Sequence, residues 1–282
     1  MIHFLCALYE EAQFLIETFQ LKKNPAIHAF PVYESREDNP WNLRLTLTGT
    51  GAVSAATAVG YIAALDAEKE ESLLINVGSC GGGTVLPVGT VILGNKLVEE
   101  TTGRCYYPDI LFSHPFRETE IHTSAKIASP EKLAQMETAV LDMEAAAIYQ
   151  AGSRFYSPHQ MVFLKVVSDH GIRENGQAYQ PGTLHKVLSN AGDGLVPFFR
   201  GLLEEQEESP RREPSVETER LKEELHCSVT MAAEVEQLMR YVNLAGVELS
   251  TLLEADRRAG RLPCKDKKEG KGYLAQLKRR VL

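Results

Sequence analysis

The 282-residue sequence lacks several features that would assign it to a particular compartment or chemistry. No apolar run reaches the roughly 20 residues that a membrane-spanning helix needs, so we expect no membrane partner. The N-terminus has no basic segment ahead of an apolar one, and we expect no signal peptide. The five cysteines are odd in number and have no CxxC spacing. They predict free thiols in the reducing cytoplasm, with no metal site and no disulfide framework.

The chain also lacks the positive charge that is typical of nucleic-acid-binding proteins. Its formal net charge is −8 at pH 7, and its hydrophobic fraction of 44% is that of an ordinary globular protein. Only residues 256–282 are strongly basic, with ten Lys/Arg against three Asp/Glu. Such a segment either binds nucleic acid or pairs with acidic residues of its own chain. Because no nucleic-acid-binding motif accompanies it, we favour the second interpretation.

The composition divides the chain into three parts. Residues 1–203 alternate short apolar runs with helical patterns, which predicts an α/β domain. Residues 204–219 are acidic, contain two prolines and have almost no apolar side chains, which is typical of a solvated linker. Residues 220–282 have apolar residues at helical spacing and predict a small helical appendage that ends in the basic segment.

Four predicted strands in the first part each end in a polar or glycine-rich segment. Because open α/β sheets bind ligands at the carboxyl ends of their strands, these segments are candidates for a binding site. Local alternatives remain, since a helix start also favours acidic residues and glycine also allows a tight turn. The strands and the segments that follow them are 2–8 with Tyr9, Glu10 and Glu11; 43–48 with Gly49, Thr50 and Gly51; 73–77 with 78–83; and 161–167 with Ser168 and Asp169.

Further patterns complete the predicted α/β order. Residues 85–93 predict a strand, and residues 52–65 predict an alanine-rich helix. Residues 183–203 predict a closing helix that is interrupted or bent near 192–197, where glycine and proline occur.

The segment Asp142-Met143-Glu144 precedes three alanines and predicts a helix over 141–152. Acidic residues are rarely buried unless they are paired or functional. At a helix start they are also favoured by the helix dipole. The pattern therefore fits either a functional site or a simple helix N-terminus.

Four of these pieces together are similar to one family. They are Y-E-E at 9–11, N-V-G-S-C-G-G at 76–82, D-M-E-A at 142–145 and V-S-D at 167–169. In this order they resemble the nucleoside phosphorylase/nucleosidase superfamily, and most closely the bacterial 5′-methylthioadenosine/S-adenosylhomocysteine nucleosidases. The resemblance covers residues 1–203. It implies a central mixed β-sheet flanked by helices, a purine nucleoside as substrate, no cofactor, and a homodimer or higher homo-oligomer.

The resemblance also implies a role for each matched residue. Asp169 matches the aspartate that protonates the purine N7 as the glycosidic bond breaks, and Ser168 would orient it. That role needs an acid whose pKa is raised by partial burial. Glu11 matches the residue that holds and activates the attacking water. Glu144 matches the glutamate that binds ribose hydroxyls, and Met143 would pack on the sugar.

Other matched positions are less complete. Ser79 and the backbone of Gly81 would line the sugar and water end of the site. Lys165 occupies a position where the nucleosidases usually have arginine. Asp142 either contacts a ribose hydroxyl or only begins the helix.

The departures from the family concern the nucleophile and the base. Hexameric purine phosphorylases have an arginine for phosphate where this chain has Asn76, so we favour water as the nucleophile. Phosphorolysis and a catalytically inactive nucleoside-binding module remain the alternatives. No aromatic near 124–127 matches the family's adenine-stacking residue. The substrate therefore stays open among methylthioadenosine, adenosylhomocysteine and 5′-deoxyadenosine.

Overall fold

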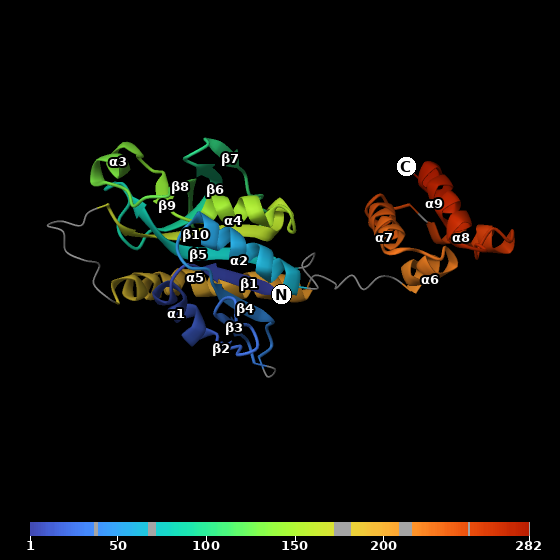
Figure 1. The fold of residues 1–282 in the computed structure, drawn as a ribbon, viewed down its shortest axis with the longest axis horizontal. Helices are drawn as coiled ribbons and strands as arrows, with labels where there is room; N and C mark the ends of the chain where they lie inside the picture. The colour runs from blue at the N-terminus through green and yellow to red at the C-terminus, as the bar shows by residue number, and fades with distance from the viewer. Residues whose placement is uncertain (37–38, 67–71, 172–181, 209–215, 248, 282) are drawn as a thin grey trace. The chain divides into compact units, whose positions relative to one another are not determined.

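The computed structural model describes residues 1–282 except 37–38, 67–71, 172–181, 209–215, 248 and 282 (Figure 1). The chain divides into two compact units, Met1–Gln206 and Glu207–Leu282. Among the described residues, no helix is both long enough and apolar enough to cross a membrane.

The acidic linker differs from its predicted extent of 204–219. Helix α5 (Thr183–Glu208) includes the residues from 204 to 208, and helix α6 (Val216–Glu224) begins before 219. Glutamate and glutamine are good helix formers, which allows the acidic sequence to continue α5. The rest of the predicted linker, 209–215, lies outside the described residues.

The first unit is built on one mixed sheet, as the resemblance implies. Its strands run in the order β10-β6-β8-β9-β5-β1-β4-β3-β2, with β7 beside β6. Strand β10 also pairs with β5, so that β5, β9, β8, β6 and β10 form a closed ring of pairings. Strands β1, β4, β5 and β10 are parallel where they pair, whereas β9 on β5 and β6 on β10 are antiparallel. The strand bounds are β1 Ile2–Cys6, β2 Lys22–Lys23, β3 Val32–Glu34, β4 Leu43–Leu47, β5 Leu73–Gly82, β6 Val91–Glu99, β7 Arg104–Tyr106, β8 Arg117–Thr123, β9 Val140–Asp142 and β10 Met161–Asp169.

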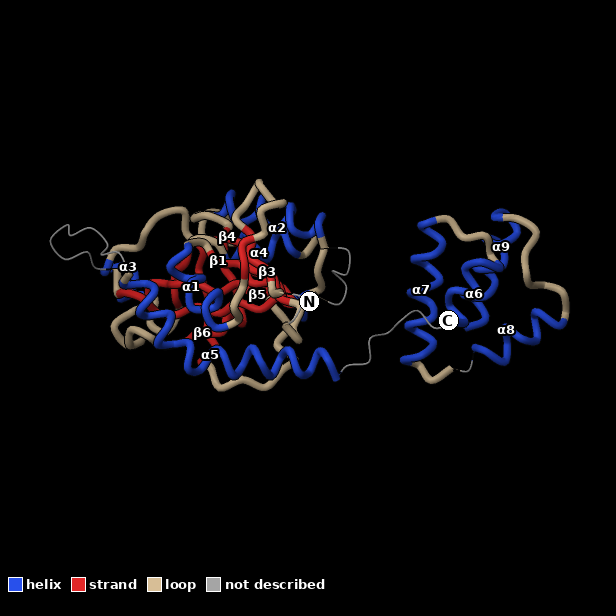
Figure 2. Tube along the Cα trace, turned by 90° about the horizontal axis from the view of Figure 1, so that it is seen from below, coloured by secondary structure: helices blue, strands red, loops and turns tan. Residues whose placement is uncertain are grey.

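Helices cover both faces of this sheet. Helices α1 (Tyr9–Thr18) and α5 lie on one face, and α2 (Ala52–Leu65) and α4 (Ala145–Gly152) lie on the other (Figures 1 and 2). Alternate strand residues point to opposite faces, so each strand contributes to two cores. Phe4, Ile75 and Leu164 pack on the α1/α5 side, while neighbours such as Leu74 and Phe163 pack on the α2/α4 side. The first unit also contains helix α3 (Pro130–Gln135) and a 3-10 turn at Pro158–Gln160.

The prediction of a glycine-rich loop at 78–83 is wrong, because β5 continues through Gly82. Gly81 and Gly82 pair with β9. A Cβ at Gly81 would lie 2.9 Å from Leu133 Cδ1, and one at Gly82 would lie 3.1 Å from Val167 Cγ1. These two glycines therefore permit close packing, Gly81 against α3 and Gly82 against β10.

Three other boundaries differ from the predictions. The strand predicted at 85–93 begins only at Val91, because Val85 is exposed in one turn and Gly89, at φ 91°, lies in the next. The helix predicted from residue 141 begins at Ala145, since Asp142 ends β9. The closing helix is not interrupted, because α5 continues past Pro197.

The second unit is a separate helical bundle with its own apolar core. It consists of α6, α7 (Val229–Leu244), α8 (Leu249–Arg258) and α9 (Lys267–Val281). Asp256 is fully buried and accepts hydrogen bonds from Tyr273, Arg261 and Arg280. Burial opposes its charge, but these donors outweigh burial and lower the pKa of Asp256 to about 2. Part of the basic segment therefore pairs with an acidic residue of the same unit.

Candidate active site

The predicted polar segments meet at the carboxyl ends of the parallel strands β1, β5 and β10. Glu11 lies in the first turn of α1, directly after β1. Ser79 lies on β5, and Ser168 and Asp169 end β10 beside it. The parallel arrangement brings these segments to one edge of the sheet, as expected.

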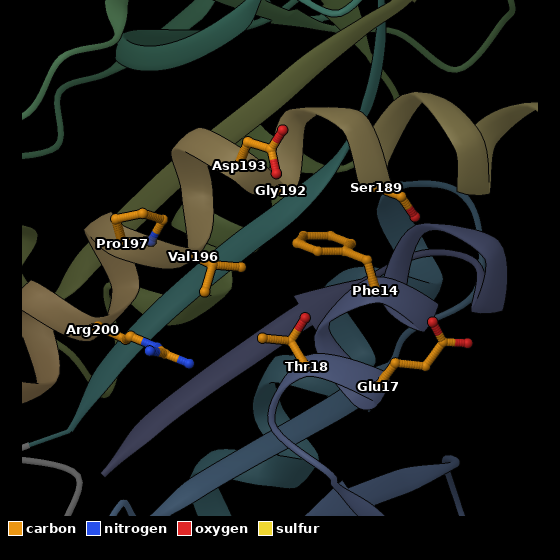
Figure 3. A pocket seen from close by; sticks show the side chains of 9 residues that line it. All are labelled: Phe14, Glu17, Thr18, Ser189, Gly192, Asp193, Val196, Pro197 and Arg200. Atoms are coloured by element: carbon orange, nitrogen blue, oxygen red, sulfur yellow. The ribbon is translucent and has the colours of Figure 1, made fainter.

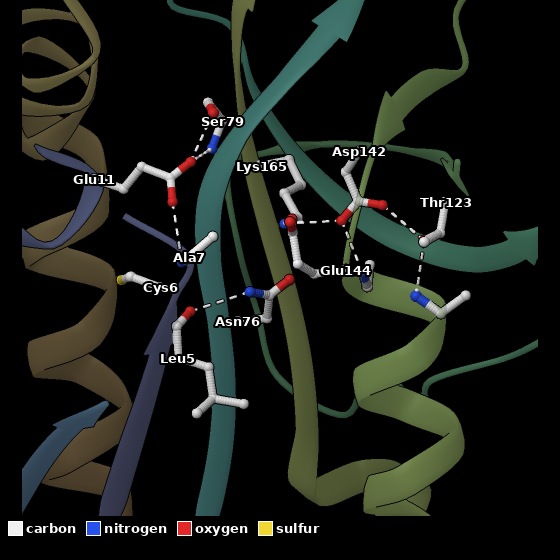
Figure 4. A network of polar contacts seen from close by, with 12 residues as sticks. Leu5, Cys6, Ala7, Glu11, Asn76, Ser79, Thr123, Asp142, Glu144 and Lys165 are labelled. Atoms are coloured by element: carbon white, nitrogen blue, oxygen red, sulfur yellow. Dashed lines mark hydrogen bonds and ion pairs between the residues drawn. The ribbon is translucent and has the colours of Figure 1, made fainter. Parts of the chain in front are cut away.

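Glu11 is the first centre of the site and is buried despite its charge. Its Oε1 accepts hydrogen bonds from the Ser79 N–H (2.7 Å) and the Ser79 hydroxyl (2.6 Å). Its Oε2 accepts from the N–H group of Ala7 at 3.1 Å (Figure 4). It also accepts from the N–H group of Leu8 at 3.0 Å, in the turn that begins α1. Four donors thus hold the carboxylate in one position and fix Ser79 against it.

Lys165 forms the second centre, together with two carboxylates. The side chain is only 1% exposed, and its Nζ lies 2.9 Å from Asp142 Oδ2 and 3.9 Å from Glu144 Oε2. Burial acts against the ammonium charge, but Asp142, Glu144 and Glu11 raise the pKa of Lys165. The lysine is therefore charged and compensates a buried acidic cluster.

Asp142 connects this cluster to the start of α4. Its Oδ1 accepts from the Thr123 hydroxyl (2.7 Å), and its Oδ2 accepts from the Ala145 N–H (2.8 Å). The Thr123 hydroxyl in turn accepts from the Ala146 N–H (2.9 Å). Both oxygens of Asp142 are thus engaged with protein groups. Thr123 is not predictable from the sequence, because a threonine at the end of a strand has no distinctive pattern.

Glu144 is the N-cap of α4 and is 6% exposed. Its Oε1 accepts from the N–H of Gly51 (2.8 Å), at the glycine turn that follows β4. Burial raises the pKa of Glu144 to about 7, although Lys165 acts in the opposite direction. The glycine turn predicted as a candidate binding segment therefore contacts the carboxylate of Glu144. Met143, between the two acidic residues, is partly exposed.

Asp169 differs from the other acidic groups of the site because it is exposed. Its Oδ2 lies 2.7 Å from the Ser168 hydroxyl, and its Oδ1 accepts from the Gly171 N–H (2.8 Å). A Cβ at Gly81 would lie 3.6 Å from Oδ1, so the carboxylate is adjacent to β5. Ser168 contacts Asp169. The predicted partial burial of Asp169 is not found among the described residues.

A groove of about 450 Å³ lies elsewhere on the first unit, between α1 and α5 (Figure 3). Phe14 and Thr18 line it from α1, and Gly192 and Val196 line it from α5. None of the predicted site residues lines this groove. Within the described part of the chain, no group of three or more His, Cys, Asp or Glu side chains could hold a metal ion.

Comparisons with known proteins find similarity in structure alone. No protein-family model and no curated protein sequence matches the chain. Three solved structures are similar to it: S-adenosylhomocysteine nucleosidase from Streptococcus pyogenes in complex with 5-methylthiotubericidin (20% identity, TM-score 0.56, 72% of this chain and 96% of that chain); 5′-methylthioadenosine/S-adenosylhomocysteine nucleosidase from Neisseria meningitidis in complex with methylthio-immucillin-A (22%, 0.55, 69% and 97%); and the corresponding nucleosidase from Colwellia psychrerythraea 34H in complex with adenine (20%, 0.55, 72% and 95%). The chain therefore has the fold of these nucleosidases over about 70% of its length.

Proposed function

We propose that this protein hydrolyses the N-glycosidic bond of a purine nucleoside, with a 5′-substituted adenosine as substrate. The observation that carries the proposal is the buried cluster of Lys165, Asp142 and Glu144. It lies with Glu11 and Asp169 at the ligand-binding edge of a fold that this chain shares with nucleosidases. A buried cation between two carboxylates costs stability unless it is well compensated, which favours a functional role. The solved relatives bind methylthio analogues and adenine, which supports the choice of substrate.

The proposed reaction uses two acidic residues in opposite roles. Asp169 in its protonated form donates a proton to the purine N7, so that the C1′–N9 bond breaks with its electron pair on the base. The oxygen of a water molecule forms the new bond to C1′, and Glu11 accepts the proton that the water loses. Glu144 binds ribose hydroxyls, and its negative charge stabilises the cationic ribosyl group of the transition state.

Water is favoured over phosphate by the charges of the site. Among its described residues, Lys165 is the only cation that contacts the acidic cluster, and Asp142 and Glu144 already compensate its charge. The position of the phosphorylase arginine is Asn76, which brings no charge. A phosphate dianion beside three buried carboxylates would therefore be poorly compensated.

A panel of purine nucleosides, incubated with and without phosphate, tests this proposal. We expect adenine release from a 5′-substituted adenosine in phosphate-free buffer, and a loss of at least about 100-fold in kcat for Asp169→Asn, which cannot donate the proton. Turnover only with phosphate, with ribose 1-phosphate as product, would replace the hydrolase by a phosphorylase. Nucleoside binding without turnover under either condition would replace it by a binding module.

We also propose that the protein works as a homodimer or higher homo-oligomer in a reducing compartment such as the cytoplasm. Exposed apolar side chains beside the candidate site support the first statement, namely Leu8 and Tyr9 after β1 and Val85 and Val88 after β5. All five cysteines are free, which supports the second. Light scattering coupled to size-exclusion chromatography tests the oligomeric state, and a monomeric mass at micromolar concentration would refute it.

A further inference from the structure

Asn76 on β5 has an unusual position for a buried amide. It is only 3% exposed, and its Nδ2 donates to the backbone oxygen of Leu5 at 3.0 Å. Its Oδ1 has no hydrogen-bond partner among the described residues. The orientation of the amide is fixed, because a carbonyl oxygen only accepts and therefore needs the NH₂ group opposite it. The unpaired acceptor must point away from Leu5, as Figure 4 shows.

The strand register identifies what this acceptor faces. Asn76 pairs with Phe163 of β10, and Gly78 pairs with Lys165. Residues two apart on a strand point to the same face, so Asn76, Gly78 and Lys165 share one face of the sheet. Gly78 has no side chain there, and a Cβ at this position would lie 3.2 Å from Glu11 Oε1. Because Gly78 has no side chain, the Glu11 carboxylate can lie against the same face as Lys165 and Asn76.

Lys165, on the same face, has more hydrogen-bond donors than the described residues accept. Its ammonium group carries three protons, and Asp142 accepts one of them at 2.9 Å. Glu144 Oε2, at 3.9 Å, is too far away for a hydrogen bond. The Lys165 ammonium group and Asn76 Oδ1 are thus a buried donor and a buried acceptor on one face, and both are incompletely paired. Each lowers the stability of the fold unless a further polar group bridges them.

We propose that Asn76, Lys165 and Glu11 together hold the attacking water, with Asn76 as the residue that fixes its orientation. This inference rests on the proposed hydrolysis. The water accepts a hydrogen bond from Lys165 and donates one to Asn76 Oδ1 and one to Glu11. When the water oxygen bonds to C1′, its proton that is hydrogen-bonded to Glu11 is transferred to that carboxylate. The proton that is hydrogen-bonded to Asn76 stays on the oxygen, which becomes the new hydroxyl of C1′. The C1′–N9 electron pair leaves with the protonated purine.

Binding both protons of the nucleophile has a consequence for its identity. Methanol carries only one hydroxyl proton, and its methyl group would have to face Glu11 or Asn76. The wild-type site should therefore strongly prefer water to methanol. In Asn76→Leu the polar acceptor is replaced by an apolar side chain, which tolerates a methyl group and no longer orients water.

The test measures products of the full-length protein and the Asn76→Leu variant in water–methanol mixtures. We expect kcat for hydrolysis to fall about 10-fold to 100-fold, which corresponds to one lost hydrogen bond, while KM changes little. The ratio of methyl riboside to free ribose should rise by about 10-fold, by the same reasoning. A merely structural role for Asn76 would not change this ratio. The matched control is Asn95→Leu on β6, whose amide bonds only Glu118 among the described contacts, and it should behave as wild type.

A crystal structure of the wild-type protein supplies a measurement that does not depend on the folding of a variant. We expect an ordered water within hydrogen-bond distance of both Asn76 Oδ1 and Lys165 Nζ. Its absence in an active protein, or an unchanged product ratio in a folded Asn76→Leu variant, would overturn this inference alone. A wild-type protein that is inactive, or active only with phosphate, would overturn the hydrolase and the inference together.

Discussion

Replacing Lys165 by methionine should destabilise the first unit strongly. The lysine is 1% exposed and contacts two buried carboxylates, at 2.9 Å and 3.9 Å. Methionine preserves most of the volume but leaves Asp142 and Glu144 buried without a cation. Removing one partner of a buried ion pair costs about 3–5 kcal/mol, because the remaining charge is uncompensated. We expect the free energy of unfolding of Lys165→Met to fall by about this amount at pH 8.

The loss should depend on pH in a defined direction. Burial already raises the pKa of Glu144 to about 7 in the presence of Lys165, and removal of the lysine raises it further. A carboxyl whose folded-state pKa is raised contributes stability at low pH that is lost as the pH rises through that pKa. The difference between Lys165→Met and wild type should therefore be largest at pH 8 and clearly smaller at pH 5.

Urea unfolding followed by tryptophan fluorescence measures this effect in the first unit alone. Trp41 is the only tryptophan of the chain, and its ring packs against that of Phe19 within that unit, with 5.9 Å between the ring centroids. The matched control is Lys96→Met, which removes an ion pair of the same length, 2.9 Å, between Lys96 and Glu120. Both side chains of this pair are partly exposed to solvent. An exposed pair contributes about 0–1 kcal/mol, so the control should lose little. Two results would refute the account of a compensated acidic cluster. One is a loss of less than about 1 kcal/mol in the free energy of unfolding of Lys165→Met at pH 8, and the other is a difference from wild type that is no smaller at pH 5 than at pH 8.

Three further changes test other parts of the structure. Because the Glu144 carboxyl has a pKa of about 7, kcat/KM of the wild type should rise as the pH increases through 7. This rise should disappear in Glu144→Gln; a rise that persists in the variant would belong to the ionisation of another group. Thr123→Val removes a bond to Asp142 and one from Ala146, and should lower the unfolding free energy by about 1–3 kcal/mol in urea titrations, unlike Thr57→Val at an exposed position of α2. Gly270→Ala places a Cβ against the backbone of Leu225, directly after α6, and should unfold the second unit, seen as lost helical circular dichroism, while nucleoside cleavage continues; retained helicity or lost cleavage would contradict it.

The sequence predicted the elements whose patterns are local. The alanine-rich helix at 52–65 has the predicted bounds, and the strand at 161–167 extends by only two residues, to Asp169. Local patterns could not distinguish glycine that approaches a ligand from glycine that approaches a neighbouring strand. The segment 78–83 is therefore predicted as a loop, although β5 continues through Gly82, which packs on Val167 of the neighbouring strand.

The site was predictable to the extent that its residues belong to recognisable segments. Glu11, Ser79 and Asp169 follow apolar strands, and the order of their motifs carries the resemblance. Thr123 and the unpaired oxygen of Asn76 depend on contacts between segments that are far apart in the sequence. Such contacts leave no periodicity or composition to read, so only the structure locates them.

The two ends of the proposed site differ in how completely the protein positions their side chains. At the proposed sugar end, Glu11, Asp142 and Lys165 are buried and held by several protein hydrogen bonds or ion pairs, so the proposed binding of a nucleoside requires little reorganisation there. At the base end, Asp169 is exposed in the described structure, with Ser168 and Gly171 as its hydrogen-bond donors. The proposed proton transfer to the purine therefore requires that the bound base and the groups that cover it exclude water from the carboxyl. In the proposed reaction, the surroundings of this acid are thus completed only in the complex, and the purine itself takes part in selecting the substrate.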